Sequence, residues 1–457
     1  MSLSSILSIA RSALLAQQRA MSVTAHNVAN AQTPGYSRQI LQLTADEPLW
    51  TPQGEIGRGV VDAGVARARD AFFDARYRSE SGLLGDSSAL RDYLGQLEAA
   101  VNEPSDIGLA ASLDGFFHSL SDLANDPADA TYRSLVVQGA NRLVSQFHQL
   151  AQAVSDVAGG AEQTMRADVD QVNDLAAKIA DLNQQILQYG GAAGGAPDLM
   201  DRRDLLVDQL SGLVGVRVLT RADGTIGVLA GDTLLVDGAS AQTLTVVAQP
   251  TGGFGLATAA GTPVDPQSGA LAALSALTTT RLPAIQARLD RLAGTLVSEV
   301  NAIHRTGYAL DGSTNTDFFD PAGVTAGSIA LAPAILASGD AIAASATNAP
   351  GDGAVALALS ELITQGLPAL GGHSLRDDYA DIAASVGVDV SGAMQDAEVH
   401  QALVEQADAM RSSVSGVSVD EEMVALISQQ QAFGAASRIV KAADEMVQEL
   451  LNLTSGT

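Results

Sequence analysis

The two ends of the chain carry the sequence feature that most restricts its fold. Near the N-terminus, apolar residues recur at steps of three, four or seven, which places them on one face of a helix: Leu3, Leu7, Ala10, Leu14, Met21 and Val28. Near the C-terminus a similar spacing runs through Val419, Met423, Leu426, Phe433, Ala436, Val440, Ala443, Val447 and Leu450. Such a narrow stripe suits one partner helix better than a thick core. We therefore predict two long terminal helices that pair as a coiled coil.

Local signals place one end of each terminal helix. Asn30 is followed by Thr33-Pro34-Gly35-Tyr36, in which Pro34 and Gly35 suit the two central positions of a type II turn. The first helix should therefore stop near Asn30. Ser418 and Glu421 form a Ser-x-x-Glu capping box just ahead of the C-terminal apolar row, which predicts the start of the second helix.

Composition excludes several classes of partner. The 457 residues carry 52 acidic and 25 basic side chains, a net charge of -27, which repels nucleic acid and anionic membranes. The absence of cysteine excludes disulfides and thiolate metal sites. No apolar run is long enough to span a membrane, and the N-terminus lacks the pattern of a cleavable secretory signal. We expect neither nucleic acid nor membrane as a partner.

The periodicity along the chain predicts a mainly α fold with an inserted small β domain and nested domains. Residues 1–64 form an N-terminal helix and extended arm, and residues 414–457 form the C-terminal helix that completes the same coiled-coil domain. Residues 65–213 and 276–413 are two halves of a helical domain, the second with a loop-rich stretch at 320–353. Short β-type runs separated by Asp-Gly and Gly-Asp turns predict the β domain at 214–275.

Several boundaries follow from glycine and proline. Residues 44–64 are predicted to be an irregular connector, with helical periodicity returning at Ala66. Helices are expected at 108–124, 128–158, 162–187, 277–303, 354–363, 374–386 and 391–413. The glycine-rich stretch 190–195 is predicted to be a flexible hinge.

The residues offer little chemistry. The six histidines are scattered without metal-ligand spacing, and neither a Gly-x-Ser-x-Gly elbow nor a phosphate-binding loop occurs. The charged stretch from Asp198 to Asp204 invites a catalytic interpretation, but carboxylates in a first helical turn also favour the helix dipole, and Arg203 can pair with its neighbours. We favour the structural interpretation and predict no catalytic residues, cofactor or metal.

Both ends also carry a resemblance to a known family. Residues 26–39, His-Asn-Val-Ala-Asn-Ala-Gln-Thr-Pro-Gly-Tyr-Ser-Arg-Gln, resemble the N-terminal signature of the axial proteins of the bacterial flagellum, which include the rod, hook and hook-associated proteins. Ser415-Gly416-Val417, Asp420-Glu421-Glu422 and Gln430-Gln431-Ala432-Phe433 resemble their C-terminal signature. The Tyr-Ser-Arg-Gln ending and the chain length point to the hook-associated members.

The resemblance implies a structural role in the extracellular flagellum. The chain would be an adapter at the hook–filament junction, exported without a cleaved signal peptide by the flagellar type III apparatus. Its partners would be copies of itself in a ring, the hook protein, the next hook-associated protein, and an export chaperone at the C-terminal helix. The residues expected to carry assembly are Leu3, Leu7, Leu14, Met21, Val28, Asn30, Pro34, Gly35, Tyr36, Met423, Leu426, Phe433, Val440, Val447 and Leu450.

Two other classes fit parts of the pattern. A hook or distal rod subunit would share the paired termini, although such proteins usually carry a Thr-x-Gly-Phe turn where this chain has Thr33-Pro34-Gly35-Tyr36. A cell-wall hydrolase carried on a flagellar scaffold would need a convergent carboxylate or metal site, which the sequence does not show. The resemblance therefore favours assembly over catalysis.

Overall fold

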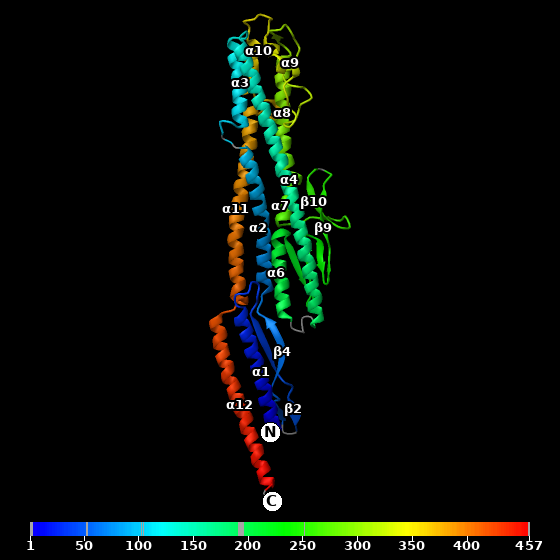
Figure 1. The fold of residues 1–457 in the computed structure, drawn as a ribbon, viewed down its shortest axis with the longest axis vertical. Helices are drawn as coiled ribbons and strands as arrows, with labels where there is room; N and C mark the ends of the chain where they lie inside the picture. Colours follow the sequence, from blue (N-terminus) through cyan, green and yellow to red (C-terminus); the bar gives the residue numbers. More distant parts are fainter. Residues whose placement is uncertain are drawn as a thin grey trace.

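A computed structural model of the chain shows an elongated molecule with both termini at one end (Figure 1). It describes residues 3–51, 54–101, 103, 105–190, 196–250 and 252–455. Two helices and a β arm form the terminal end, long helices form a shaft, and short helices and loops form the opposite tip. Among the described residues, no helix is both long and apolar enough to cross a membrane. The fold is mainly α with small sheets, as the sequence predicts.

The terminal end consists of two long helices and a hairpin. Helices α1 (Leu3–Asn30) and α12 (Val419–Ser455) lie side by side. Strands β1 (Gln39–Ala45) and β4 (Val60–Arg67) pair antiparallel with a bulge, and β2 (Leu49–Thr51) pairs with β3 (Gly54–Ile56). We call residues 39–67 the arm. The prediction of an irregular connector at 44–64 is wrong for residues 44–45, 49–51, 54–56 and 60–64, because the paired strands there satisfy each other's backbone groups.

The shaft is built from long helices. They are α2 (Ala71–Val101), α4 (Ala130–Gln188), α6 (Pro197–Leu213), α7 (Ala270–Ala276), α8 (Leu282–His304) and α11 (Leu375–Ser415), with one π turn at Leu277–Arg281 between α7 and α8. Helix α2 starts at Ala71 rather than Ala66, because β4 runs to Arg67 and the Asp70 carboxylate accepts a hydrogen bond from Phe72 N at 2.8 Å.

Two predicted breaks in helices are wrong. Helix α4 passes straight through Gly159-Gly160, since a helical glycine costs only about 1 kcal/mol and the buried row Val157, Ala161 and Met165 continues across it. Helix α11 likewise joins the segments predicted at 374–386 and 391–413, because Val386 and Val390 are both buried one turn apart. The hinge predicted at 190–195 lies, apart from Gly190, outside the described residues.

The β unit lies against one side of α4 (Figure 1). One antiparallel sheet has the order β5-β6-β7-β8, and a second has the order β11-β10-β9. The strands are β5 (Val216–Thr220), β6 (Ile226–Ala230), β7 (Thr233–Asp237), β8 (Ser240–Ala241), β9 (Leu244–Ala248), β10 (Phe254–Thr258) and β11 (Pro263–Val264). The chain enters this unit from α6 and leaves it into α7, so it is inserted between helical segments.

The tip closes the far end of the shaft. It contains α3 (Leu109–Asn125), α9 (Pro333–Ala337), α10 (Ala354–Glu361) and the short pair β12 (Tyr308–Ala309) and β13 (Ala343–Ser345). The rings of Phe116, Phe318 and Phe319 contact one another at 5.0 to 6.0 Å between centroids. One continuous cluster of buried apolar residues runs from the tip through the shaft into the β unit, and none of its described members lies in α1 or α12.

The fully buried Asn183 of α4 fixes the β unit to the shaft. Its Nδ2 donates to the carbonyls of Gly238 at 2.8 Å and Ile226 at 3.0 Å, and its Oδ1 accepts from Ile226 N at 3.2 Å. Arg203 of α6 donates to the same Oδ1 and to the Gly224 carbonyl. One side chain thus satisfies backbone groups on two turns of the sheet.

We expect Asn183→Ala to lower the free energy of unfolding by about 2–4 kcal/mol, because it leaves several buried backbone groups unpaired. Urea denaturation measures the change. The control is Asn141→Ala, which removes an exposed amide that bonds only to the preceding helical turn. Equal stability of the two variants would contradict the role given to Asn183.

Candidate assembly site at the terminal helices and their joint

The seam between α1 and α12 is made of small and polar side chains. Gln429 Nε2 donates to Thr24 Oγ1 at 3.1 Å, and Asn27 Nδ2 donates to Glu422 Oε2 at 3.1 Å, so the helices run antiparallel. The side chains most fully buried between them are Ala10, Ala16, Thr24, Asn27, Glu422, Ala436 and Ala443. Alanines let two helices approach closely but remove little apolar area from water.

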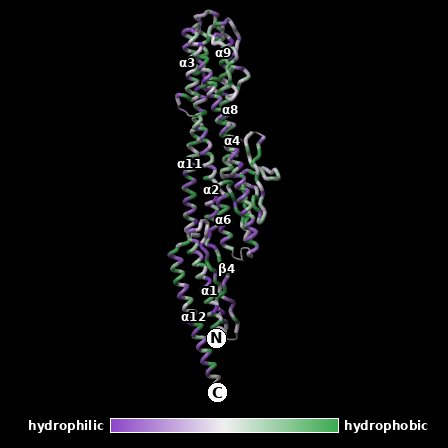
Figure 2. Tube along the Cα trace, in the orientation of Figure 1, coloured by the Kyte–Doolittle hydropathy of each residue, from purple (hydrophilic) through white to green (hydrophobic). Residues whose placement is uncertain are grey.

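The large apolar residues predicted to form this seam are less buried than expected. Leu3, Leu7, Leu14, Met21 and Val28 are half-buried in α1, and Leu426, Val440 and Val447 are half-buried in α12. Met423, Phe433 and Leu450 are exposed, at 46%, 36% and 52%. In the first half of α12 the row facing α1 lies one residue earlier than predicted, at Glu422 and Gln429, because polar contacts set the register there. Figure 2 shows hydrophobic positions alternating with hydrophilic ones along both helices.

The turn after α1 has the geometry that its sequence predicts. Tyr36 N donates to the Thr33 carbonyl at 3.1 Å, and Gly35 has φ +76°, the left-handed value that the third position of a type II turn requires. A Cβ at Gly35 would also meet Leu205 at 3.2 Å. Pro34 is exposed, and Asn30 Nδ2 donates to the His26 carbonyl at 3.0 Å, which closes the last turn of α1.

A buried polar node joins the turn to α12. Asn27 Oδ1 accepts hydrogen bonds from Tyr36 Oη at 2.8 Å and Gln39 N at 2.9 Å, while Asn27 Nδ2 also donates to the Gln39 carbonyl. Arg38 Nε donates to Glu422 Oε1 at 2.7 Å, so the carboxylate of Glu422 bridges Arg38 and Asn27. Burial raises the pKa of Tyr36, and the charges of Asp198, Asp201 and Glu422 raise it further. The phenol therefore stays protonated and donates.

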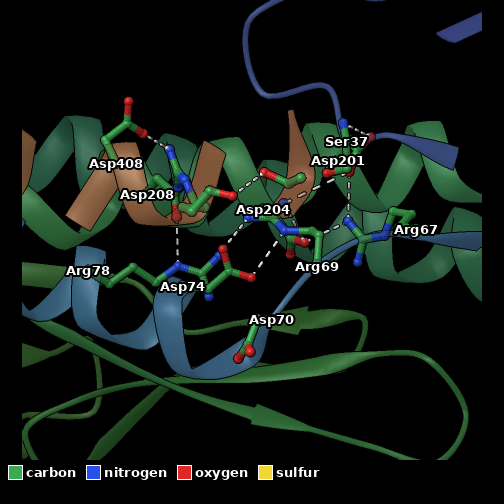
Figure 3. Close-up of polar contacts among 12 residues, drawn as sticks. Ser37, Arg67, Arg69, Asp70, Asp74, Arg78, Asp201, Asp204, Asp208 and Asp408 are labelled. Atoms are coloured by element: carbon green, nitrogen blue, oxygen red, sulfur yellow. Dashed lines mark hydrogen bonds and ion pairs between the residues drawn. The ribbon is translucent and has the colours of Figure 1, made fainter. Parts of the chain in front are cut away.

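A second polar cluster joins the terminal end to the shaft (Figure 3). Asp201, Asp204 and Asp208 lie on one face of α6, at steps of three and four. The Arg67 guanidinium at the end of the arm donates to Asp201 at 2.8 Å and to Asp204 at 2.7 Å. Ser37 donates to Asp201 through both its backbone nitrogen, at 2.9 Å, and its hydroxyl, at 2.7 Å.

The same acidic face also holds the shaft helices. Arg69 donates to Asp204 at 3.1 Å, and two of its nitrogens donate to the carboxylate of Asp74 in α2, at 2.6 and 3.0 Å. Asp208 accepts from Arg78 of α2 and from Arg411 of α11, each at 2.6 Å. We call the residues of these two paragraphs the joint: Ser37, Arg67, Arg69, Asp74, Arg78, Asp201, Asp204, Asp208 and Arg411. Four segments distant in sequence therefore meet on one face of α6.

Each carboxylate of the joint is held by at least one arginine. Arg203 forms the ion pair with Asp204 that the sequence suggested, at 3.5 Å, and also donates to Asn183 and the Gly224 carbonyl. Within the part of the chain that the structure describes, no group of three or more histidine and acidic residues could hold a metal ion.

Comparison with known proteins identifies the family. The family model described as the flagellar hook-associated protein FlgK helical domain matches residues 94–319. A flagella basal body rod protein model matches residues 7–36, and the flagellar basal body rod FlgEFG protein C-terminal model matches residues 410–453. The flagellar hook-associated protein 1 of Bacillus subtilis is 31% identical over 98% of this chain and 97% of its own length. The chain belongs to the flagellar hook-associated protein 1 family.

Other relatives agree with this assignment. The flagellar hook-associated protein 1 of Salmonella typhimurium is 33% identical over 69% of this chain and 59% of its own length, and that of Escherichia coli is 28% identical over similar shares. The solved structure of the flagellar hook junction protein FlgK from Burkholderia pseudomallei superposes with a TM-score of 0.67 at 19% identity, over 75% of this chain and all of that one. That likeness shows a shared fold for this hook-associated protein.

The joint gives this hook-associated protein a testable pH dependence. Burial alone would raise the pKa of Asp204, but the charges of Arg67 and Arg69, with Arg203 and Arg78, lower it from 3.8 to about 2. A carboxylate whose pKa is depressed by folding stabilises the fold above its unfolded pKa, and this contribution is lost as the pH falls toward its folded pKa. We expect about 2 kcal/mol of stability to disappear between roughly pH 5 and pH 2.

Asp204→Asn should abolish the fall in the free energy of unfolding between pH 5 and pH 2. It should also lower stability at neutral pH, because four arginines keep their charge without the Asp204 carboxylate. Urea denaturation at a series of pH values measures both effects. Asp174→Asn is the matched control, since Asp174 is exposed and pairs only with Lys178 on the helix surface. If Asp204→Asn keeps the full acid sensitivity of the parent, Asp204 is not its source.

Proposed function

We propose that the chain is a structural adapter at the hook–filament junction of the flagellum, without enzymatic activity. The names of its relatives, which describe hook-associated and hook junction proteins, support this role. The supporting feature of the molecule is α12, whose surface away from α1 carries Val424, Ile427, Ile439 and Met446 at 43% to 69% exposure. Such a row is costly in water and suits burial between subunits.

Assembly is proposed to proceed through the two terminal helices. Copies of the chain would pack in a ring, with α1 and α12 burying each other's outer faces, and the hook protein and the next hook-associated protein would stack on either side. The matches of rod-protein models to residues 7–36 and 410–453 support a terminal region built like that of other axial subunits. The exposed row of α12 is also the surface on which an export chaperone would fit before assembly.

The domain organisation and the export route belong to the same proposal. Residues 1–64 with 414–457 would form the assembling unit, residues 65–213 with 276–413 the supporting helical unit, and 214–275 a lateral β unit. The protein would leave the cell through the flagellar export apparatus without cleavage of its N-terminus. The assembly residues proposed from the sequence all lie in α1, α12 or the turn that follows α1.

A strain that lacks the protein should build hooks without attached filaments, and expression of the parent chain should restore filaments. We expect the α12 variant Ile427→Ser with Ile439→Ser to restore about tenfold fewer, because it removes apolar contact worth roughly 1.4 kcal/mol at each interface. Electron microscopy of negatively stained cells gives the count.

The matched control is Leu336→Ser with Leu357→Ser, which changes two residues of similar exposure at the tip. Normal filaments in the deletion strain would refute the adapter role. Equal loss in both double variants would show a general effect of polar substitution rather than assembly through α12.

In the free subunit, α1 and α12 should be weakly protected from hydrogen exchange. The α1–α12 seam buries mainly alanines and polar groups, so little apolar area offsets the loss of chain entropy. Hydrogen exchange of the purified chain should be at least about tenfold faster in residues 3–28 and 419–450 than in α4, whose inner face is continuously buried. Equal protection in all three segments would mean that the terminal pair is already rigid before assembly.

A further inference from the structure

The tip of the arm carries the most exposed large apolar side chain recorded for the described residues. Trp50, the sole tryptophan of the chain, is 76% exposed, and Leu49 beside it is 56% exposed. Both belong to β2, which pairs only with the three residues of β3, so that Leu49 lies opposite Ile56 and Trp50 opposite Glu55. A two-stranded ribbon this short is marginal in water by itself.

Residues 59–62 of the arm are held against α1. Val60 N donates to Ser12 Oγ at 3.3 Å, Arg19 and Asp62 form an ion pair at 2.6 Å, and Gly59 sits so close to α1 that a Cβ would collide with the Ser12 hydroxyl. A Cβ at Gly54 or Gly57 would meet nothing within 4 Å. The hairpin of β2 and β3 lies at the end of the molecule where the N-terminus lies (Figure 1).

We infer that the arm tip is a docking element for a second copy of this chain, and that Trp50 and Leu49 pack on the exposed apolar row of that copy's α12. This inference rests on the proposed assembly function. The two apolar surfaces are different patches at the same end of one molecule, so pairing them joins copies head to tail. Contacts of this kind generate rings or helical tubes rather than closed dimers.

Charge opposes a membrane as the occupant, and the length of α12 accommodates a second copy. The tip is flanked by the acidic residues Asp46, Glu47 and Glu55, which oppose docking on an anionic lipid surface. Helix α12 spans 37 residues, about 55 Å at 1.5 Å per residue, and leaves apolar side chains exposed from Val419 to Leu451. The row is therefore long enough to receive a neighbour's arm and still pack on further helices.

The test uses the deletion strain and three variants of the full chain. Trp50→Ser should restore about tenfold fewer filaments than the parent, a change that corresponds to about 1.4 kcal/mol of binding free energy per contact. Trp50→Phe keeps an aromatic ring and should restore nearly parental numbers. Ile107→Ser is the matched control, because Ile107 is 74% exposed but lies far from the arm, next to α3. The thermal midpoint of purified Trp50→Ser should match that of the parent, since an exposed side chain contributes little to folding.

A photo-reactive benzoyl-phenylalanine at position 50 identifies the occupant. In intact flagella it should cross-link to a peptide from residues 419–455 of another copy, and in the dilute purified subunit it should give no adduct between chains. An adduct to another axial protein, to lipid, or to no partner overturns the inference, as does parental filament number with Trp50→Ser. If Trp50→Ser assembles normally while the α12 double variant fails, the arm inference is wrong but the proposed function stands. If both assemble normally, the arm inference and the proposed packing through α12 are both wrong, while the adapter role is decided separately by the deletion strain.

Discussion

The contact between α1 and α12 determines the physical character of the terminal end. It holds the two ends of the chain together with alanines and polar pairs such as Thr24–Gln429 and Asn27–Glu422, and not with large apolar side chains. An antiparallel pair of this kind has a defined register but little buried apolar area. None of the described members of the continuous core of the shaft lies in either helix, so few large apolar side chains are fully buried at the terminal end. The position of the terminal helices therefore depends on the contacts that join them to the shaft.

The joint supplies those contacts by electrostatic means. Arg67 and Ser37 reach Asp201 from the arm and the turn, while Arg69, Arg78 and Arg411 reach the same face of α6 from the shaft. Buried ion pairs add little stability over well-packed apolar residues in the same place, although removing one partner is costly, and they accept only a narrow range of geometries. A polar joint therefore fixes the direction in which the terminal helices leave the shaft.

The sequence predicted the fold class and failed where the deciding contacts were distant in the chain. Apolar periodicity identified the terminal helices, the shaft and the inserted β unit, since each depends on spacing within one segment. It placed false breaks at Gly159-Gly160 and between Val386 and Val390, because the buried rows that carry both helices across come from packing. The acidic spacing of Asp201, Asp204 and Asp208 was visible, but their partners Arg67 and Arg411 lie 134 and 203 residues from the carboxylates they bind. Local pattern cannot pair residues at such separations.

The same distinction explains the exposed surfaces. If the pair of α1 and α12 had to be stable without other chains, large residues such as Val424, Ile427 and Ile439 would face α1 and alanines would face outward. In α12 the opposite holds, because Ala436 and Ala443 are buried and the large residues are exposed. The arm repeats this inversion, because its large apolar residues Leu49 and Trp50 are exposed, whereas residues 59–62 are fixed on α1. Side chains arranged in this way destabilise the free subunit and can lower the free energy only when further chains cover them. The terminal end thus has the energetics of one side of an interface, while the shaft and the tip have those of a folded domain.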